Sequence, residues 1–335
     1  MAGSKFLKKK IVPLDPEKTE TVEDVVAALG RCSFQGRSLA HALDAWEAMA
    51  RDRRCLRVMS LAGAMVPAGM GLLVVRLIER GLLDVLICTG ATLSHDLCNT
   101  VARDEQAHYL GDEKADDLAL REQSINRIYD TYLPERGFDT AEDALAALLP
   151  KVHFAKNVPG RRTVSTQSFF AQIGRHLPGR SILTAAARHN VAIFVPGISD
   201  SELALTLVTH NRTHADKIEF DTLVDVEHFA ELIVSKPKSG LVSIGGGVPR
   251  NWAQQIYPYL HLRGNVKDVD VEGYRYGVRI TTDRPEFGGL SGCTISESKS
   301  WGKYTNRSID ASVICDATIA LPILTAALFQ RLDKR

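Results

Sequence analysis

Short apolar runs alternate with amphipathic segments along most of the chain. The apolar runs end in glycine or small polar residues and lead into stretches with helical periodicity. Strands are predicted at 56–61, 85–88, 191–195, 241–244, 278–281 and 313–315, and helices at 71–80, 94–103, 167–176, 181–189 and 226–234. Alternating strands and helices predict an α/β fold, with a mainly parallel sheet covered by helices on both faces.

The N-terminal region has a different pattern. Residues 1–15 predict a flexible tail, and 21–51 predict a helical N-terminal arm in which Ser38 is a candidate cap. No Ser/Gly linker, low-complexity tract or internal repeat follows, so residues 16–335 predict one domain.

Composition excludes several classes of protein. The 41 basic residues are nearly balanced by 40 acidic ones, which argues against a nucleic-acid-binding surface. Lys8 to Lys10 are expected to be a solvated tail rather than a polybasic anchor. No charge occurs between Arg57 and Arg76, but glycines and Pro67 interrupt this stretch. It predicts a strand, a turn and a helix rather than a membrane span.

Cysteine usage indicates the compartment. The six cysteines form no CxxC pair, so neither a disulfide framework nor a zinc or other metal site is expected. No signal peptide is evident. Reduced thiols in a cytoplasmic protein are the interpretation that follows.

Small or polar residues follow several predicted strands, at the edge where parallel sheets bind ligands. They include Thr89, Asp200, the turn 245–247 and Asp316. Three consecutive glycines suit close approach to a bulky group such as a pyrophosphate, although a tight turn without ligand explains them equally well. The turn is not GxGxxG. Asp200 and Asp316 are also candidate helix caps.

A second group of residues lies near Lys303. Trp301 supplies a wall for a cation and can desolvate an amine, which would lower the pKa of Lys303 and expose a nucleophilic lone pair. Glu297 could hold an ammonium group of a substrate. The alternative is a surface Trp-Gly-Lys turn without function.

Together these segments resemble the deoxyhypusine synthase family, in order, from about Leu39 to Leu332. The Ser-Trp-Gly-Lys motif at 300–303 is the most specific part, and the pair Asp316-Ala317 and an apolar final helix at 321–332 follow it. The resemblance implies a Rossmann-like fold, NAD as cofactor and a cytoplasmic homotetramer with shared sites. It also implies a transferase that moves an aminobutyl group from a polyamine through a lysine imine to an acceptor amine.

The resemblance assigns roles residue by residue. Lys303 matches the imine-forming lysine, and Glu297 and Trp301 match residues that line the polyamine tunnel. Eight residues match NAD-binding positions: Thr89, Asp200, Gly245, Gly246, Thr282, Ser291, Asp316 and Ala317.

The sequence departs from the family pattern at several positions. The family has a His-His pair after the glycine turn, whose first histidine assists proton transfer; here Asn251 occupies that catalytic position and Trp252 follows. Leu205 and Leu290 replace two acids that hold ammonium groups, which should weaken triamine binding. Other departures are His95 in place of a ribose-binding Glu and a longer segment at 256–278, whose Asp268, Asp270 and Glu272 are either replacement acids or surface residues.

With these departures, the sequence resembles the deoxyhypusine-synthase-like branch of the family, which is related to homospermidine synthase. The favoured prediction is therefore a small-amine acceptor such as putrescine. The first alternative is a true deoxyhypusine synthase that modifies a lysine of a translation factor precursor. The second is related chemistry with another donor, or a silent NAD-binding protein, which the presence of Lys303, Glu297 and Trp301 argues against. No nucleic-acid or membrane partner is expected.

Overall fold

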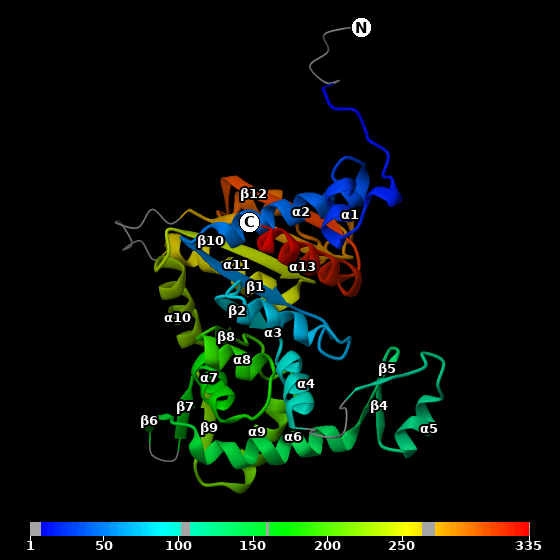
Figure 1. Ribbon diagram of the computed structural model, residues 1–335. Coiled ribbons are helices and arrows are strands. Elements are labelled where there is room, and N and C mark those ends of the chain that lie inside the picture. The colour runs from blue at the N-terminus through cyan, green and yellow to red at the C-terminus, as the bar shows by residue number, and fades with distance from the viewer. Residues whose placement is uncertain (1–7, 102–107, 159–160, 263–271, 335) are drawn as a thin grey trace.

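A six-stranded sheet forms the centre of the protein in the computed structural model, which describes residues 8–101, 108–158, 161–262 and 272–334. All neighbouring strands pair in parallel. Their order across the sheet is β12 (Tyr304–Ile314), β11 (Tyr274–Thr281), β10 (Lys238–Ile244), β1 (Cys55–Leu61), β2 (Val85–Cys88) and β8 (Ala192–Phe194) (Figure 1). The predicted α/β fold with a parallel sheet is therefore confirmed.

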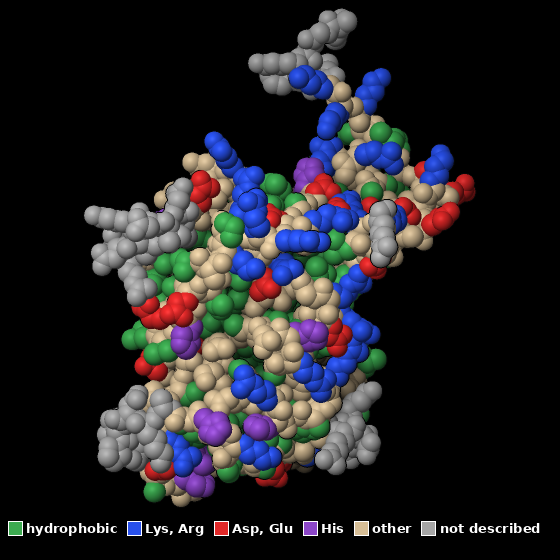
Figure 2. Space-filling view, turned by 60° about the vertical axis from the view of Figure 1, so that its left-hand side comes forward, with side chains coloured by type: hydrophobic (Ala, Val, Ile, Leu, Met, Phe, Trp, Pro, Cys, Tyr) green, Lys and Arg blue, Asp and Glu red, His purple; other side chains and the backbone are tan. Residues whose placement is uncertain are grey.

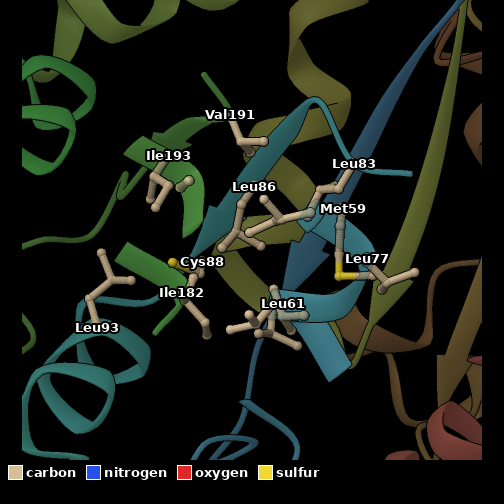
Figure 3. Close-up of a cluster of buried hydrophobic side chains, with 14 of the residues drawn as sticks. Met59, Leu61, Leu77, Leu83, Leu86, Cys88, Leu93, Ile182, Val191 and Ile193 are labelled. Atoms are coloured by element: carbon tan, nitrogen blue, oxygen red, sulfur yellow. The ribbon is translucent and has the colours of Figure 1, made fainter. Parts of the chain in front are cut away.

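Helices cover both faces of this sheet. On one face, buried side chains of the sheet pack against α2 (Phe34–Arg51), α3 (Gly71–Glu79), α8 (Ile182–His189) and α13 (Ala317–Asp333). Figure 3 shows Met59 of β1 beside Leu77 of α3, and Cys88 of β2 beside Ile182 of α8. On the other face, the alternate side chains pack against α10 (Thr222–Val234) and α11 (Gly247–Leu262).

The remaining elements surround this core, and patterning predicted few of them. Two small three-stranded sheets contain β3 (Tyr109–Leu110), β5 (Thr131–Pro134) and β4 (Ile125–Ile128), and β6 (Ala155–Val158), β7 (Arg161–Val164) and β9 (Lys217–Phe220). The other helices are α1 (Val22–Leu29), α4 (Gly90–Val101), α5 (Asp117–Glu122), α6 (Glu135–Leu148), α7 (Thr166–His176), α9 (Glu202–Thr213) and α12 (Ile295–Ser300). Short 3-10 turns occur at Pro16–Lys18, Leu149–Lys151, Pro285–Phe287 and Leu290–Gly292.

The surface agrees with the composition. Figure 2 shows basic and acidic side chains intermixed over one face of the molecule, with hydrophobic side chains between them. Within the described ranges, no helix is both long and apolar enough to cross a bilayer. The same ranges contain no group of three or more His, Cys, Asp or Glu side chains placed to hold a metal ion.

The helical arm, α1 and α2, is attached to the C-terminal helix. Arg331 of α13 forms ion pairs with Glu23 at 3.0 Å, Asp44 at 2.7 Å and Glu47 at 3.0 Å. The expectation that Ser38 caps the arm's long helix is wrong. That helix begins at Phe34, and the Ser38 hydroxyl lies inside it and donates to the Phe34 carbonyl, so the residue takes part in the helix rather than starting it.

One buried carboxylate fixes the loop that follows β8. Asp225 of α10 accepts hydrogen bonds from the backbone N–H and hydroxyl of Thr166, at 3.0 and 2.8 Å, and from the Gln167 N–H at 3.1 Å. The Thr166 hydroxyl in turn accepts from the Val195 N–H at 3.0 Å. Since Val195 begins the loop that carries Asp200, this chain of bonds positions one side of the strand-end region.

We expect Asp225→Ala to lower the free energy of unfolding by about 2–3 kcal/mol, because it leaves three buried donors without their acceptor. Urea denaturation measures the change. Glu231→Ala, on the exposed side of the same helix, is the matched control and should change stability by less than about 0.5 kcal/mol. Equal effects of the two substitutions would contradict this role for Asp225.

Candidate functional site

A pocket of about 520 Å³ lies at the carboxyl ends of the central strands. The loops after β1, β2, β8, β10, β11 and β12 all contribute to its wall. The structure brings together all eight residues that the sequence assigned to a cofactor: Thr89, Asp200, Gly245, Gly246, Thr282, Ser291, Asp316 and Ala317. The volume of the pocket is in the usual range for small-molecule and cofactor sites.

The glycine turn forms one wall of this pocket. Gly245 and Gly247 have φ angles of +72° and +60°, which L side chains rarely adopt. Gly246 is required for a different reason, because a Cβ atom there would lie 2.4 Å from the Cβ of Ser291. The Ser291 hydroxyl also accepts a hydrogen bond from the Gly247 N–H at 3.0 Å. The turn therefore packs directly against residues 290–293.

Several helices begin at the pocket. Helices α4, α11 and α13 start at Gly90, Gly247 and Ala317, so their N-terminal N–H groups and positive dipole ends lie near its wall. Asp316 both lines the pocket and caps α13, accepting from the Thr318 N–H at 2.7 Å. Ser201, not Asp200, caps α9, which leaves the Asp200 carboxylate available to a ligand. The arrangement suits a ligand with both anionic groups and hydroxyls.

Lys303 is buried, with 7 % of its surface exposed. Its Nζ lies 3.5 Å from Oδ1 of Asn251 and 5.5 Å from the centre of the Trp301 ring. Burial lowers the pKa of Lys303 from its ordinary value; the charge of Arg250 adds to this, while Cys293 and Glu297 oppose it. Lys303 thus has a larger neutral fraction near pH 7 than an exposed lysine, as a nucleophilic amine requires.

Glu297 lies on α12 (Ile295–Ser300), and Trp301 follows the last residue of that helix, two residues before Lys303. Gly302 has a φ of +69°, which turns the chain sharply between Trp301 and Lys303. The turn places Trp301 outward with 61 % of its surface exposed, whereas Lys303 points inward. Glu297 is exposed as well. The alternative of a surface turn therefore describes the tryptophan but is wrong for the lysine.

Helix α11 connects the two groups of residues. It begins at Gly247 in the pocket wall, and Asn251 follows one turn later, a rise of roughly 6 Å. Lys303 itself does not line the pocket, but residues 290–293 lie between the glycine turn and the lysine. Two buried arginines, Arg250 and Arg279, donate to carbonyls of this segment. Sequence analysis missed both arginines.

The positions that depart from the family pattern have different surroundings. Trp252 stacks on Phe229, with ring centres 5.2 Å apart, and packs near Phe194, so it is a core residue. Leu205 and Leu290 are half exposed, at 56 % and 50 %. Neither offers an ammonium group a charged partner.

His95 lies outside the pocket described above. It lines a neighbouring hollow, which also includes Asp200 and Leu205. Burial, with a smaller contribution from His108, lowers the pKa of His95 to about 4, so the ring is neutral at pH 7. Glu272 is exposed, whereas Asp268 and Asp270 lie outside the described residues.

Comparison with known proteins identifies the family. The deoxyhypusine synthase family model matches residues 24–328 of the chain. The chain belongs to the deoxyhypusine synthase family. The resemblance inferred from the Ser-Trp-Gly-Lys motif is thus confirmed, and membership implies a transferase.

Relatives match over nearly the whole length. The chain is 37 % identical to "Probable deoxyhypusine synthase 2" of Methanosarcina acetivorans, over 97 % of this chain and 91 % of that protein. It is 29 % identical to "Deoxyhypusine synthase-like protein" of Chlorobaculum parvum, over 99 % and 92 %. The crystal structure of a "putative deoxyhypusine synthase" from Entamoeba histolytica superposes with a TM-score of 0.63 at 14 % identity, covering 96 % of this chain and 97 % of that one, and shows that the fold is shared.

Proposed function

We propose that this protein is an NAD-dependent transferase that moves an aminobutyl group from a polyamine, through an imine on Lys303, to a small amine acceptor. The observation that carries the proposal is the buried Lys303 amine, held within reach of an uncharged amide one helical turn from the strand-end pocket. An exposed lysine is almost wholly protonated at neutral pH and cannot attack.

The pocket fits a dinucleotide. Two glycines with positive φ leave the backbone bare, and the first N–H groups of α11 face the same space, which suits a pyrophosphate. The Asp200 and Asp316 carboxylates suit ribose hydroxyls or an amide. When bound there, NAD would supply a hydride acceptor for the carbon beside the secondary amine of the polyamine, and a hydride donor at the end of the turnover.

The residues around Lys303 then have separate tasks. The neutral Lys303 amine attacks the carbon of the substrate imine; a C–N bond to lysine forms and the bond to the departing diamine breaks. The acceptor amine later displaces lysine in the same way. In this proposal the exposed Glu297 carboxylate and the exposed Trp301 ring hold an ammonium group of the substrate. Asn251 orients the amine through its Oδ1 acceptor, but an amide is neither an acid nor a base near pH 7, so water or the amines themselves must move protons.

The acceptor is the least constrained part of the proposal. Leu205 and Leu290 remove two charges that a triamine tunnel would use, which supports a smaller substrate set with putrescine as acceptor. The second candidate is transfer to a lysine of a translation factor precursor. It is supported by the 37 % identity to proteins named as deoxyhypusine synthases.

Exposed apolar residues around the site support its burial between copies of the chain in an oligomer. Val248, Leu290, Trp301 and Ile319 are each at least half exposed and lie in or next to the pocket, or beside Lys303. Exposed apolar side chains grouped around a polar site are typical of surfaces that a partner covers. We propose that a homotetramer covers them, as family membership implies.

Ala317→Leu should lower NAD affinity at least tenfold, because the larger side chain fills the pocket at the first residue of α13. Isothermal titration calorimetry measures the affinity. Ala68→Leu, at an exposed position after β1 outside the pocket, is the control and should bind like wild type. Unchanged NAD affinity in a folded Ala317→Leu protein would remove this pocket from the proposal.

Borohydride should trap an amine-derived fragment on Lys303 when NAD and a polyamine are present, as intact-protein and peptide mass spectrometry will show. Lys303→Arg keeps the charge but cannot form this imine, so transfer should fall at least a thousandfold while NAD still binds. Lys299→Arg, on neighbouring α12, is the matched control and should transfer normally. Wild-type transfer by Lys303→Arg would refute the covalent route.

Product analysis decides the acceptor. Incubation with NAD, spermidine and putrescine should yield homospermidine, and a lysine-bearing translation factor precursor added in equal amount should gain no aminobutyl mass. Liquid chromatography with mass spectrometry follows both products in one reaction. The reverse result, a modified protein and no homospermidine, would establish the second candidate instead.

A further inference from the structure

A row of polar residues crosses the sheet beneath the start of α11. Ser60, Ser243, Arg279 and Ser312 are register partners on β1, β10, β11 and β12, so they lie side by side on one face. Strands of a parallel sheet covered on both faces are normally apolar throughout. Arg250 of α11, which lies over this face, adds a second guanidinium.

Both arginines are almost completely buried, with 3 % of Arg250 and 2 % of Arg279 exposed. Arg250 donates to the carbonyls of Leu290, Ser291 and Cys293 at 3.4, 3.5 and 2.7 Å, and Arg279 donates to that of Ser291 at 2.5 Å. Neither forms an ion pair with any residue that the structure describes, and the Nε atoms of both have no partner there. Two adjacent buried cations without a carboxylate destabilise the fold. Their presence here therefore indicates a role other than stability.

Residues 290–293, which the two arginines hold, contact the glycine turn, and Arg250 itself lies next to the residue that contacts Lys303. On one side, Ser291 accepts from the Gly247 N–H and fills the space beside Gly246. On the other side, Asn251, the residue after Arg250, contacts the Lys303 amine. Both side chains therefore contact the support of the glycine turn, and Arg250 also precedes the residue that contacts the Lys303 amine.

We propose that Arg250 and Arg279 are positioning residues for the chemistry at Lys303. Both clamp residues 290–293 through backbone carbonyls, and the charge of Arg250, which precedes the residue in contact with the Lys303 amine, disfavours the protonated form of that lysine. The proposal deepens the proposed function, on which its catalytic meaning rests. It also explains why arginine stands where an apolar residue would pack more stably.

The charges around Lys303 agree with this role. Arg250 of α11 lowers the pKa of Lys303 in addition to burial, and the groups that oppose it are Cys293 in the loop and Glu297 on α12. Like-charge repulsion acts on the arginines as well: burial first, and then Arg250, lowers the pKa of Arg279 to about 10. Arg279 still remains charged at pH 7, so the positive field persists.

Reductive methylation measures the lysine directly and requires no turnover. The purified protein without NAD is treated with formaldehyde and cyanoborohydride between pH 6 and 10, and peptide mass spectrometry quantifies methylated Lys303. In Arg250→Gln the midpoint should rise by about one pH unit, which lowers the neutral fraction at pH 7 roughly tenfold. Arg250→Lys keeps the charge, so its midpoint should stay within a few tenths of a unit of wild type.

Hydrogen exchange reports the clamp separately. The peptide spanning 288–295 should exchange faster in both variants, because neither side chain can reach all three carbonyls. Arg307→Gln, which removes an exposed cation four residues from Lys303, is the control and should change neither measurement. If Arg250→Gln does not fold, Arg250→Met, which keeps an unbranched stem but no charge, replaces it in both measurements, and Arg279→Gln tests the clamp alone.

Two results would overturn the proposal. An unchanged Lys303 midpoint in a folded Arg250 variant without the charge would reduce the arginines to a packing role, even if exchange increases. Unchanged exchange would remove the clamp. Failure of the proposed function would look different: no borohydride-trapped fragment on wild-type Lys303, with the midpoint shift in Arg250→Gln intact.

Discussion

The common direction of the six central strands is the constraint on which the site depends. Because every strand runs the same way, every carboxyl end and every following loop is at one edge of the sheet. Helices then begin at that edge, and their unpaired N–H groups face the same space. Residues as far apart in the sequence as Thr89 and Ala317 therefore line one pocket, because separate loops of the chain each contribute to its wall. No single motif in the sequence could make this pocket.

Lys303 depends on the same frame in a different way. Its side chain is buried and reaches Asn251 of α11, so water is largely excluded from the amine. A buried ammonium without a close carboxylate is unfavourable, and the neutral amine is therefore favoured. Glu297 is exposed to solvent, and its charge opposes the effect of burial on the Lys303 pKa only in part. The lowered pKa is a property of burial and neighbouring charge, not of the lysine alone.

The sequence predicted the central strands well because they are short apolar runs followed by recognisable turns. It also assigned to a cofactor eight of the residues that line the pocket, which required the family resemblance, since Thr282 and Ser291 have no local signature. It missed the two small sheets, whose strands are brief and partly exposed. Arg279 was missed too, although a charge between Val278 and Ile280 in a buried strand is a signal that could have been noticed. The contact between Gly246 and Ser291 could not be foreseen, because it is a tertiary packing fact.

The strand order has a consequence for how the chain folds. The two central strands, β1 and β10, pair Cys55 with Lys238, and most of the chain lies between them. Closing so long a loop is entropically expensive before any pairing stabilises it. We therefore expect slow folding, with a phase in which β1 and β2 expose an apolar unpaired edge to solvent. Protein concentration during refolding is then as decisive for yield as the stability of the finished fold.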